Sequence, residues 1–104
     1  MRGELLKGNL DLLLLSVLSA GPLHGYAAIE ELRRRSRGAF DLPEGTVYPA
    51  LHRLERTGLV TSRWSRESGR RRRLYELTRG GRTAFAEQRA EWRRFARAVT
   101  VVAG

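Results

Sequence analysis

The last quarter of the chain holds the sequence feature that most constrains the fold. Between residues 85 and 102, core-type side chains recur at steps of three and four, the a and d spacing of a coiled coil. They are Phe85, Gln88, Trp92, Phe95, Val99 and Val102. A helix over residues 79–102 is roughly 36 Å long, at about 1.5 Å per residue, so the rest of this short chain is too small to cover it. We expect this seam to pair with a second chain; an amphipathic helix packed on its own domain is the alternative.

The segments before this helix change their period from 3.6 to 2. The longer period predicts helices over residues 4–20, 23–35 and 43–57. The shorter period predicts strands over residues 59–64 and 72–77, joined by a turn over residues 65–71. Gly58 is a typical helix stop and Thr78 a typical helix N-cap. The expected fold is therefore mainly α with a small β-hairpin.

The first helix is apolar around most of its circumference, which predicts burial on two sides, one of them against a partner subunit. The stripes expected to be buried are Tyr26, Ile29 and Leu32 in the second helix and Val47, Leu51 and Leu54 in the third. Pro49 requires that the third helix either starts near Thr46 or has an irregular first turn.

The charge of the chain is unevenly distributed. Residues 1–52 carry six basic and six acidic side chains, whereas residues 53–104 carry fourteen basic and five acidic ones. The whole net charge of +9 therefore lies in the second half. Such a concentrated positive field attracts a polyanion, which is DNA, RNA or an anionic membrane surface.

Other classes of function find little support. The chain has no cysteine, two histidines and two aspartates, and it contains no catalytic constellation, metal cluster or phosphate-cradling loop. We expect no enzyme, no metal and no cofactor. The N-terminus loosely resembles a signal peptide through Arg2, Lys7 and the leucines after them, but Asp11 interrupts the apolar run. That run is too short to span a membrane, so a cytoplasmic protein is expected.

The predicted order of elements is that of a winged helix-turn-helix followed by a long C-terminal helix. Such a fold places its third helix in the DNA major groove and its hairpin on the flanking backbone or minor groove. The four arginines at residues 70–73 are expected at the hairpin tip, where they would neutralise phosphates. We expect a DNA-binding domain over residues 1–78, whose first helix also joins the dimer interface, and a dimerisation helix over residues 79–104.

Six short motifs, in order and at matching spacing, resemble the PadR family of bacterial transcriptional regulators in its short subfamily. They read Leu23-His24-Gly25-Tyr26, Pro43-Glu44-Gly45-Thr46-Val47-Tyr48-Pro49-Ala50-Leu51, Arg53-Leu54-Glu55, Gly58-Leu59-Val60, Gly69-Arg70-Arg71-Arg72 and Tyr75-Glu76-Leu77-Thr78. Trp92 in the last helix also fits. The chain departs from the family at Leu74, where an aromatic residue is usual, and at Glu76, where a basic one is common.

The resemblance implies a dimeric repressor that binds an inverted-repeat operator in double-stranded DNA. It also implies that the two subunits pair through their first and last helices. The residues expected at that interface are Leu10, Leu13, Leu14, Phe85, Gln88, Trp92, Phe95 and Val99. Some members of the family bind flat aromatic compounds there, so Trp92, Phe95 and Leu14 are candidate effector contacts. Plain interface packing is the alternative role for Trp92.

The residues expected to contact DNA are Thr46, Tyr48, His52, Arg53, Arg56, Arg70, Arg71, Arg72 and Arg73. Three of them have structural alternatives. Tyr48 is either a contact or a core tyrosine, Thr46 either caps the third helix or donates to a phosphate, and Arg53 either reads guanine or forms an ion pair within its helix.

Neighbouring residues are expected to shape the site rather than bind DNA. Gly45 would allow a close backbone approach or a positive φ. Gly25 and Tyr26 would fix the start of the second helix against the third, and His24 is expected to be structural.

The remaining hypothesis is an RNA-binding or other sequence-independent nucleic-acid module. It would share the charge but would not need two-fold symmetry, and it would usually expose aromatic platforms. Only Trp64 and Tyr75 are available for that role, and both can pack under the hairpin.

Overall fold

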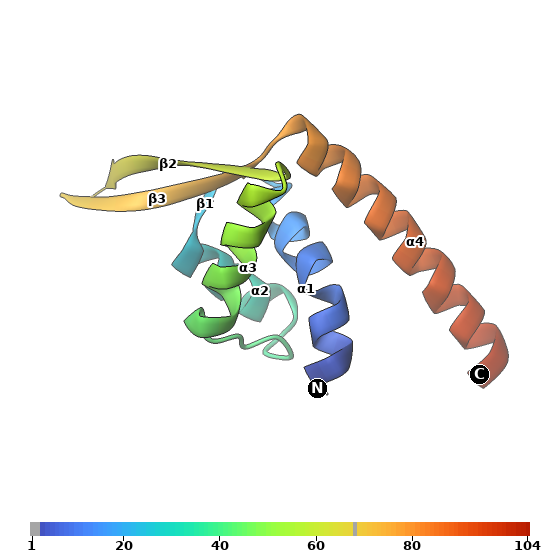
Figure 1. Cartoon of the computed structure of the whole chain (residues 1–104). Helices are drawn as coiled ribbons and strands as arrows, with labels where there is room; N and C mark the ends of the chain where they lie inside the picture. Colours follow the sequence, from blue (N-terminus) through green and yellow to red (C-terminus); the bar gives the residue numbers. More distant parts are fainter. Residues whose placement is uncertain (1–2, 68) are drawn as a thin grey trace.

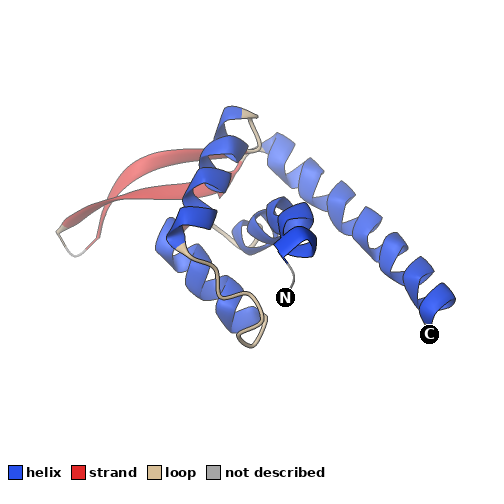
Figure 2. Cartoon of the chain, turned by 60° about the horizontal axis from the view of Figure 1, so that its bottom comes forward, coloured by secondary structure: helices blue, strands red, loops and turns tan. Residues whose placement is uncertain are grey.

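The computed structural model describes residues 3–67 and 69–104. Arg2, in the N-terminus that resembles a signal peptide, and Ser68, in the predicted turn, lie outside the described residues. The elements in chain order are α1 (Gly3–Leu18), β1 (Leu23–His24), α2 (Gly25–Arg35), α3 (Glu44–Arg56), β2 (Val60–Glu67), β3 (Arg70–Leu77) and α4 (Arg79–Ala103). The first three helices form one body. The β2–β3 hairpin projects from one side of it, and α4 runs along the other side (Figures 1 and 2). The expected mainly helical fold with a small hairpin is confirmed.

The sheet has one strand more than the sequence predicted. Its order is β1-β3-β2, and all its pairs are antiparallel. Leu23 and His24 pair with Tyr75 and Leu74, so the prediction that α2 begins at residue 23 is wrong. His24 has an extended backbone, with φ −68° and ψ 154°, and the backbone of Leu23 and His24 pairs with the edge of β3 before α2 begins at Gly25.

The hairpin is longer than predicted. Glu67 pairs with Arg70 and Arg66 with Arg71, so the expected turn over residues 65–71 is wrong. Gly69 has a φ of +77°, a conformation that glycine adopts without a steric penalty, and this allows the chain to reverse within a short connection. The four arginines therefore form the outer half of strand β3, beginning with Arg70 beside the turn, and their side chains alternate between its two faces.

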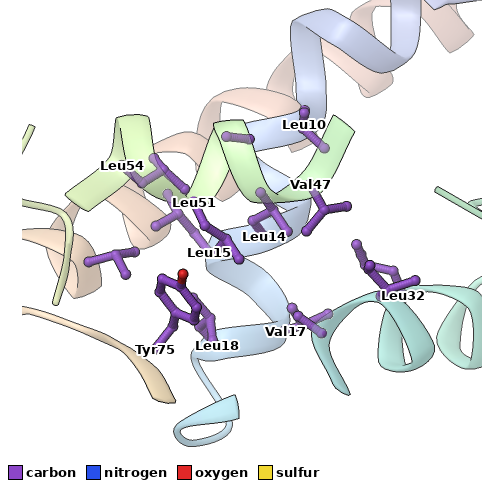
Figure 3. Close-up of a cluster of buried hydrophobic side chains, with 14 of the residues drawn as sticks. Leu10, Leu14, Leu15, Val17, Leu18, Leu32, Val47, Leu51, Leu54 and Tyr75 are labelled. Carbon is purple, nitrogen blue, oxygen red and sulfur yellow. The ribbon is translucent and has the colours of Figure 1, made fainter. Parts of the chain in front are cut away.

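Helix α1 lies at the centre of the core. Leu14, Leu15, Val17 and Leu18 are almost completely buried, and they face side chains of α2, α3 and the sheet (Figure 3). The stripe predicted on α3 is confirmed, since Val47, Leu51 and Leu54 are all buried.

The stripe predicted on α2 is only partly correct, because Tyr26 is 56% exposed. The buried residues of α2 are Gly25, Ala28, Ile29 and Leu32, at i, i+3, i+4 and i+7. Gly25 thus occupies the core position that the sequence assigned to its neighbour. A count of apolar side chains does not detect glycine, so periodicity places only the first position of the stripe one residue too late, at Tyr26, and predicts Ile29 and Leu32 correctly.

Both predicted helix boundaries around the hairpin are confirmed. Gly58, with a φ of +82°, follows α3, and the amide of Leu59 donates to the carbonyl oxygen of Leu54 at 3.0 Å. The Thr78 hydroxyl accepts from the amide of Gly81 at 3.0 Å and donates to the carbonyl oxygen of Gly58 at 2.6 Å. Thr78 therefore caps α4 and also ties its start to the end of α3.

Two adjacent glycines at the start of α4 give a matched test of this junction. A Cβ at Gly81 would lie 2.0 Å from the backbone oxygen of Leu59, whereas a Cβ at Gly80 would meet its nearest neighbours at 3.6 Å. We expect Gly81→Ala to lower the free energy of unfolding by about 1–3 kcal/mol, since backbone must move. Gly80→Ala should be neutral or slightly stabilising, because alanine favours the helix. Urea unfolding of both variants checks this; equal effects would contradict the packing of α4 on the sheet.

Candidate nucleic-acid interface

The face of α3 opposite the core points away from the protein. At about 100° per residue, the positions farthest from Val47, Ala50, Leu51 and Leu54 are 45, 49, 52 and 56. Their side chains are all exposed. Of the residues predicted to contact DNA, His52 and Arg56 therefore lie at the centre of the outward face of α3.

Pro49 lies on this same face, inside a helix that already begins at Glu44. A start near Thr46 is therefore wrong. The N-cap of α3 is Pro43, so the prediction that Thr46 caps the helix is also wrong. The carbonyl group that Pro49 leaves without an amide donor belongs to Gly45, which is exposed to water. Gly45 does not have a positive φ, so only a close approach of its backbone remains as a reason for glycine there.

Tyr48 flanks the outward face on the side of the hairpin and is half-buried. Its ring lies directly over Gly25, where a Cβ would be 2.5 Å from Cε1 and 2.7 Å from the hydroxyl oxygen. Glycine is required at position 25 because the tyrosine ring leaves no room for a Cβ, and not because of the backbone φ angle. As predicted for Gly25, this contact fixes the start of α2 against α3.

Arg53 lies on the opposite flank, toward α1. Its guanidinium donates a hydrogen bond to the carboxylate of Asp11 on α1, so the predicted pair within α3 is wrong and the actual pair joins two helices. Both side chains are close to half exposed, and such pairs contribute at most about 1 kcal/mol. Arg53 is thus directed away from His52 and Arg56, toward the groove between α1 and α4.

The arginines of β3 differ in their surroundings. Arg71 and Arg73 lie over the two-ring system of Trp64, with their guanidinium carbons 4.6 and 5.0 Å from its centroid. Arg70 and Arg72 belong to the other face of the strand and are exposed. The expectation that Trp64 and Tyr75 both pack under the hairpin is half correct, since Tyr75 is buried but Trp64 is 54% exposed.

A cavity of about 520 Å³ separates this arginine face from the starts of α2 and α3. Tyr48, Trp64, Arg71 and Arg73 are among its lining residues. His24 closes one end. Its Nδ1 donates to the carbonyl oxygen of Arg73 at 3.1 Å, and its buried Nε2 lies 3.3 Å from a carboxylate oxygen of Glu67 without hydrogen-bond geometry. His24 therefore joins β1 to β3, the structural role expected of it.

Tyr75 lies beneath the same region. Burial raises the pKa of its phenol above the ordinary value for tyrosine, the negative charge of Glu55 raises the pKa further, and the positive charge of Arg73 opposes this rise.

The three arginines of α2 all pair with the two glutamates of the same helix. Arg33 pairs with Glu30 at 2.5 Å, and Arg34 and Arg35 both pair with Glu31 at 2.8 and 2.9 Å. Hydrogen bonds from these two arginines lower the pKa of Glu31 to about 2. The excess positive charge of the chain therefore lies mainly on the hairpin and on α4, each of which carries six arginines against two glutamates.

A second groove, of about 490 Å³, lies between α1 and α4. Trp92 and Phe95 line it, with ring centroids 6.1 Å apart, and are 40% and 59% exposed. Val99 is exposed as well, whereas Phe85 and Gln88 are half-buried and Phe85 packs against the core of the chain. The alternative of packing on its own domain therefore holds for the start of the seam. The remainder is uncovered, and its pairing with a second chain stays a prediction.

The predicted interface residues of α1 face inward instead. Leu14 is 0% exposed, Leu10 is buried, and Leu13 packs against the same core. The prediction that Leu14 lines the effector groove is wrong, because its side chain is completely buried in the core of the chain. The leucines of α1 that do line the groove are Leu5 and Leu12. A helix that is apolar all round gives no signal for which face lies outward.

The three-helix body with its antiparallel hairpin is a winged helix-turn-helix. The model of the transcriptional regulator PadR-like family matches residues 14–87. Transcriptional regulator Rv3488 of Mycobacterium tuberculosis is 42% identical over 77 residues, which are 74% of this chain and 69% of that protein. The chain belongs to the PadR-like family of transcriptional regulators, and is not an enzyme.

Solved structures show the same likeness. A PadR family transcription regulator from Clostridium difficile is 34% identical, with a TM-score of 0.82 over 92% of this chain and 99% of that one. A transcriptional regulator from Clostridium thermocellum has a TM-score of 0.90 at 25% identity, over 100% of this chain and 99% of that one. The Bacillus subtilis PadR in complex with operator DNA shares the fold, with a TM-score of 0.68 at 22% identity over 76% of this chain and 45% of that one.

Two further findings concern residues 3–67 and 69–104. No helix there is long and apolar enough to cross a membrane. Within the same ranges, no three metal-ligating side chains gather in one place.

The contact between Gly25 and Tyr48 can be tested by a double-mutant cycle. Gly25→Ala should lower the free energy of unfolding by about 1–3 kcal/mol, because the added methyl group displaces the tyrosine ring. In a Tyr48→Ala background, the same change should cost less by at least about 0.5 kcal/mol, since the ring is gone. Denaturant unfolding of the four proteins measures the coupling. Strictly additive effects would show that the ring does not occupy this position.

Proposed function

We propose that this protein is a sequence-specific DNA-binding regulator that acts as a dimeric repressor at an inverted-repeat operator. The observation that carries the proposal is the outward face of α3, with His52 and Arg56 at its centre, beside a hairpin that presents a row of arginines. In the structural relative from Bacillus subtilis, a PadR protein is bound to operator DNA. A dimer that occupies an operator blocks access of polymerase, so repression is the expected mode.

In this proposal α3 enters the major groove. His52 and Arg56 reach base edges or phosphates, and Tyr48 directs its hydroxyl to the backbone beside them. Thr46 and Arg53 lie on the far flank, where Arg53 is available to DNA only if it leaves Asp11. Arg70, Arg71 and Arg72 neutralise phosphates next to the groove and release counterions.

The uncovered part of α4 supports a homodimer. Trp92, Phe95 and Val99 form an exposed apolar stripe beside Leu5 and Leu12 of α1. A second copy related by a two-fold axis would cover this stripe with its own. The two copies of α3 would then face the same side of the DNA, about one turn or roughly 34 Å apart.

The groove beside Trp92 also supports a small-molecule effector. A volume of about 490 Å³ lies within the range of ligand sites, and Trp92 and Phe95 offer faces for a flat aromatic molecule. A ligand seated between α1 and α4 would change the angle between subunits, and with it the spacing of the recognition helices.

One observation favours a second candidate. Trp64 is exposed beside two arginines, as in proteins that stack single-stranded bases on an aromatic platform. An RNA-binding module of this kind would need neither an operator nor a dimer.

Selection from random duplex DNA separates the two candidates. The purified protein is incubated with random duplexes at ~150 mM salt, which screens the sequence-blind attraction of phosphates, and the retained DNA is sequenced. An enriched inverted repeat is expected. Absence of any enriched sequence, with binding that disappears as salt rises, would contradict the proposal and favour the RNA-binding module.

The hairpin arginines should determine the salt dependence of binding. We expect Arg71→Ala/Arg72→Ala to lower the slope of log K against log salt by ~1–2 units, because two phosphate contacts are lost. The control is Arg34→Ala/Arg35→Ala on α2, which removes the same charge from residues already paired with Glu31. Fluorescence anisotropy with the selected duplex measures both slopes, and equal slopes for the two variants would exclude the hairpin from the interface.

The apolar stripe of α4 should determine dimerisation. We expect Trp92→Glu to raise the dimer dissociation constant at least about tenfold, since a carboxylate would be buried at the centre of the interface. Ala90→Glu is the matched control, because it adds the same side chain to the exposed opposite face of α4. Sedimentation equilibrium compares the two variants. A Trp92→Glu protein that dimerises like the wild type would contradict the interface.

A further inference from the structure

A row of side-chain contacts runs from the last turn of α3 along the hairpin. The Ser62 hydroxyl donates to the carboxylate of Glu55 at 2.6 Å, and Nε of Arg73 donates to the Ser62 hydroxyl at 2.9 Å. The guanidinium of Arg73 then lies over Trp64, and that of Arg71 lies over the same ring. We call these five residues, Glu55, Ser62, Trp64, Arg71 and Arg73, the wing brace.

The wing brace lies on the face of the hairpin that is directed toward α3. Trp64 is the register partner of Arg73, and Ser62 is the partner of the buried Tyr75, so all their side chains share one face of the sheet. This face lines the cavity opposite Tyr48. A terminal nitrogen of Arg73 also lies 4.0 Å from the carboxylate of Glu55, so a carboxylate of α3 partly offsets the charge of Arg73.

Outside the wing brace, the outer part of the hairpin also approaches the rest of the protein at Glu67, whose carboxylate lies 3.3 Å from Nε2 of His24. Strand β1 pairs only with Leu74 and Tyr75, so the strands beyond Arg73 form a two-stranded ribbon. Such a ribbon alone is marginally stable and free to twist. Among the residues that the structure describes, Glu55 makes the side-chain hydrogen bond that joins α3 to the hairpin. The wing brace thus links the recognition helix to the arginines that lie farthest from it.

We propose that the wing brace sets the angle of the hairpin to α3, so that the wing arginines meet phosphates at a fixed distance from the bases that α3 reads. The inference rests on the proposed DNA-binding function. Glu55 and Trp64 are positioning residues that need not touch DNA. Arg73 acts within the protein, whereas Arg71, held over the indole, keeps the edge of its guanidinium available for a phosphate. A hairpin ordered before binding avoids the entropic cost of ordering it on the DNA.

Hydroxyl-radical footprints of the selected operator test the positioning role. We expect Trp64→Ala to weaken operator binding about three- to tenfold, through loss of the stacking that holds two guanidinium groups. Protection should be lost at the flanking positions contacted by the hairpin and retained at the positions read by α3. Trp64→Phe, which keeps an aromatic face, should restore most of the flanking protection. A purely structural role of Trp64 would instead weaken all protections together.

Adjacent arginines of β3 provide the matched control. Arg72→Ala should lower the salt slope by about 0.9, the value of one phosphate contact, whereas Arg73→Ala should weaken binding with an unchanged slope. Glu55→Gln is a second variant in case Trp64→Ala does not fold. It keeps an acceptor for the Ser62 hydroxyl but removes the charge that faces Arg73, and it should reduce the same flanking protections.

The outcomes distinguish this inference from the proposed function. If the wild type binds its operator and the Trp64 and Glu55 variants leave the footprint unchanged, the wing brace has no positioning role while the function stands. A fall in salt slope for Arg73→Ala equal to that for Arg72→Ala would also overturn the inference. If the wild type selects no operator at all, the proposed function fails and the inference fails with it.

Discussion

The burial of α1 is the constraint on which the rest of the structure depends. Its leucines and Val17 fill the core, and the helix contacts α2, α3, α4 and the sheet. Because α1 separates α3 from α4 (Figures 1 and 2), it leaves each of those helices one free face. The outward face of α3 carries His52 and Arg56, whereas the exposed stripe of α4 beside α1, with Trp92 and Phe95, is apolar. A nucleic acid suits the first face, and a second copy of the chain suits the second.

The arginines of the chain differ in how far neighbouring carboxylates offset their charge. On α2, arginines and glutamates neutralise each other within one helix, and on α3 Arg53 is held by Asp11. The hairpin has a large excess of arginine, so its field is not cancelled locally. Arg73 nevertheless differs from its neighbours in the basic run, since its Nε donates to Ser62 and a terminal nitrogen lies 4.0 Å from Glu55.

The sequence predicted the order and type of nearly all elements, because each has a clear apolar period or a clear stop such as Gly58. Its predictions are wrong where a core position holds a residue without an apolar side chain, and where a helix is apolar on all its faces. Gly25 holds a core position that periodicity cannot detect, and the leucines of α1 do not indicate which of them face outward. Asp11 and Arg53 are far apart in the chain, and Glu55 and Ser62 belong to a helix and to the strand that follows it, so the period of a single element reveals neither pair. The strand register pairs Trp64 with Arg73, and the sequence alone does not reveal this register.

The central claim is that α4 pairs two copies so that their recognition helices lie one DNA turn apart. The chain has no cysteine, so His52→Cys gives a single labelling position on the outward face of α3 in each copy. Electron spin–spin distance measurement on the labelled protein in the absence of DNA tests the claim directly. The account predicts one narrow distribution centred at about 34 Å. A spin-labelled protein with no dipolar coupling, or with a distribution centred well away from one helical turn, would contradict it.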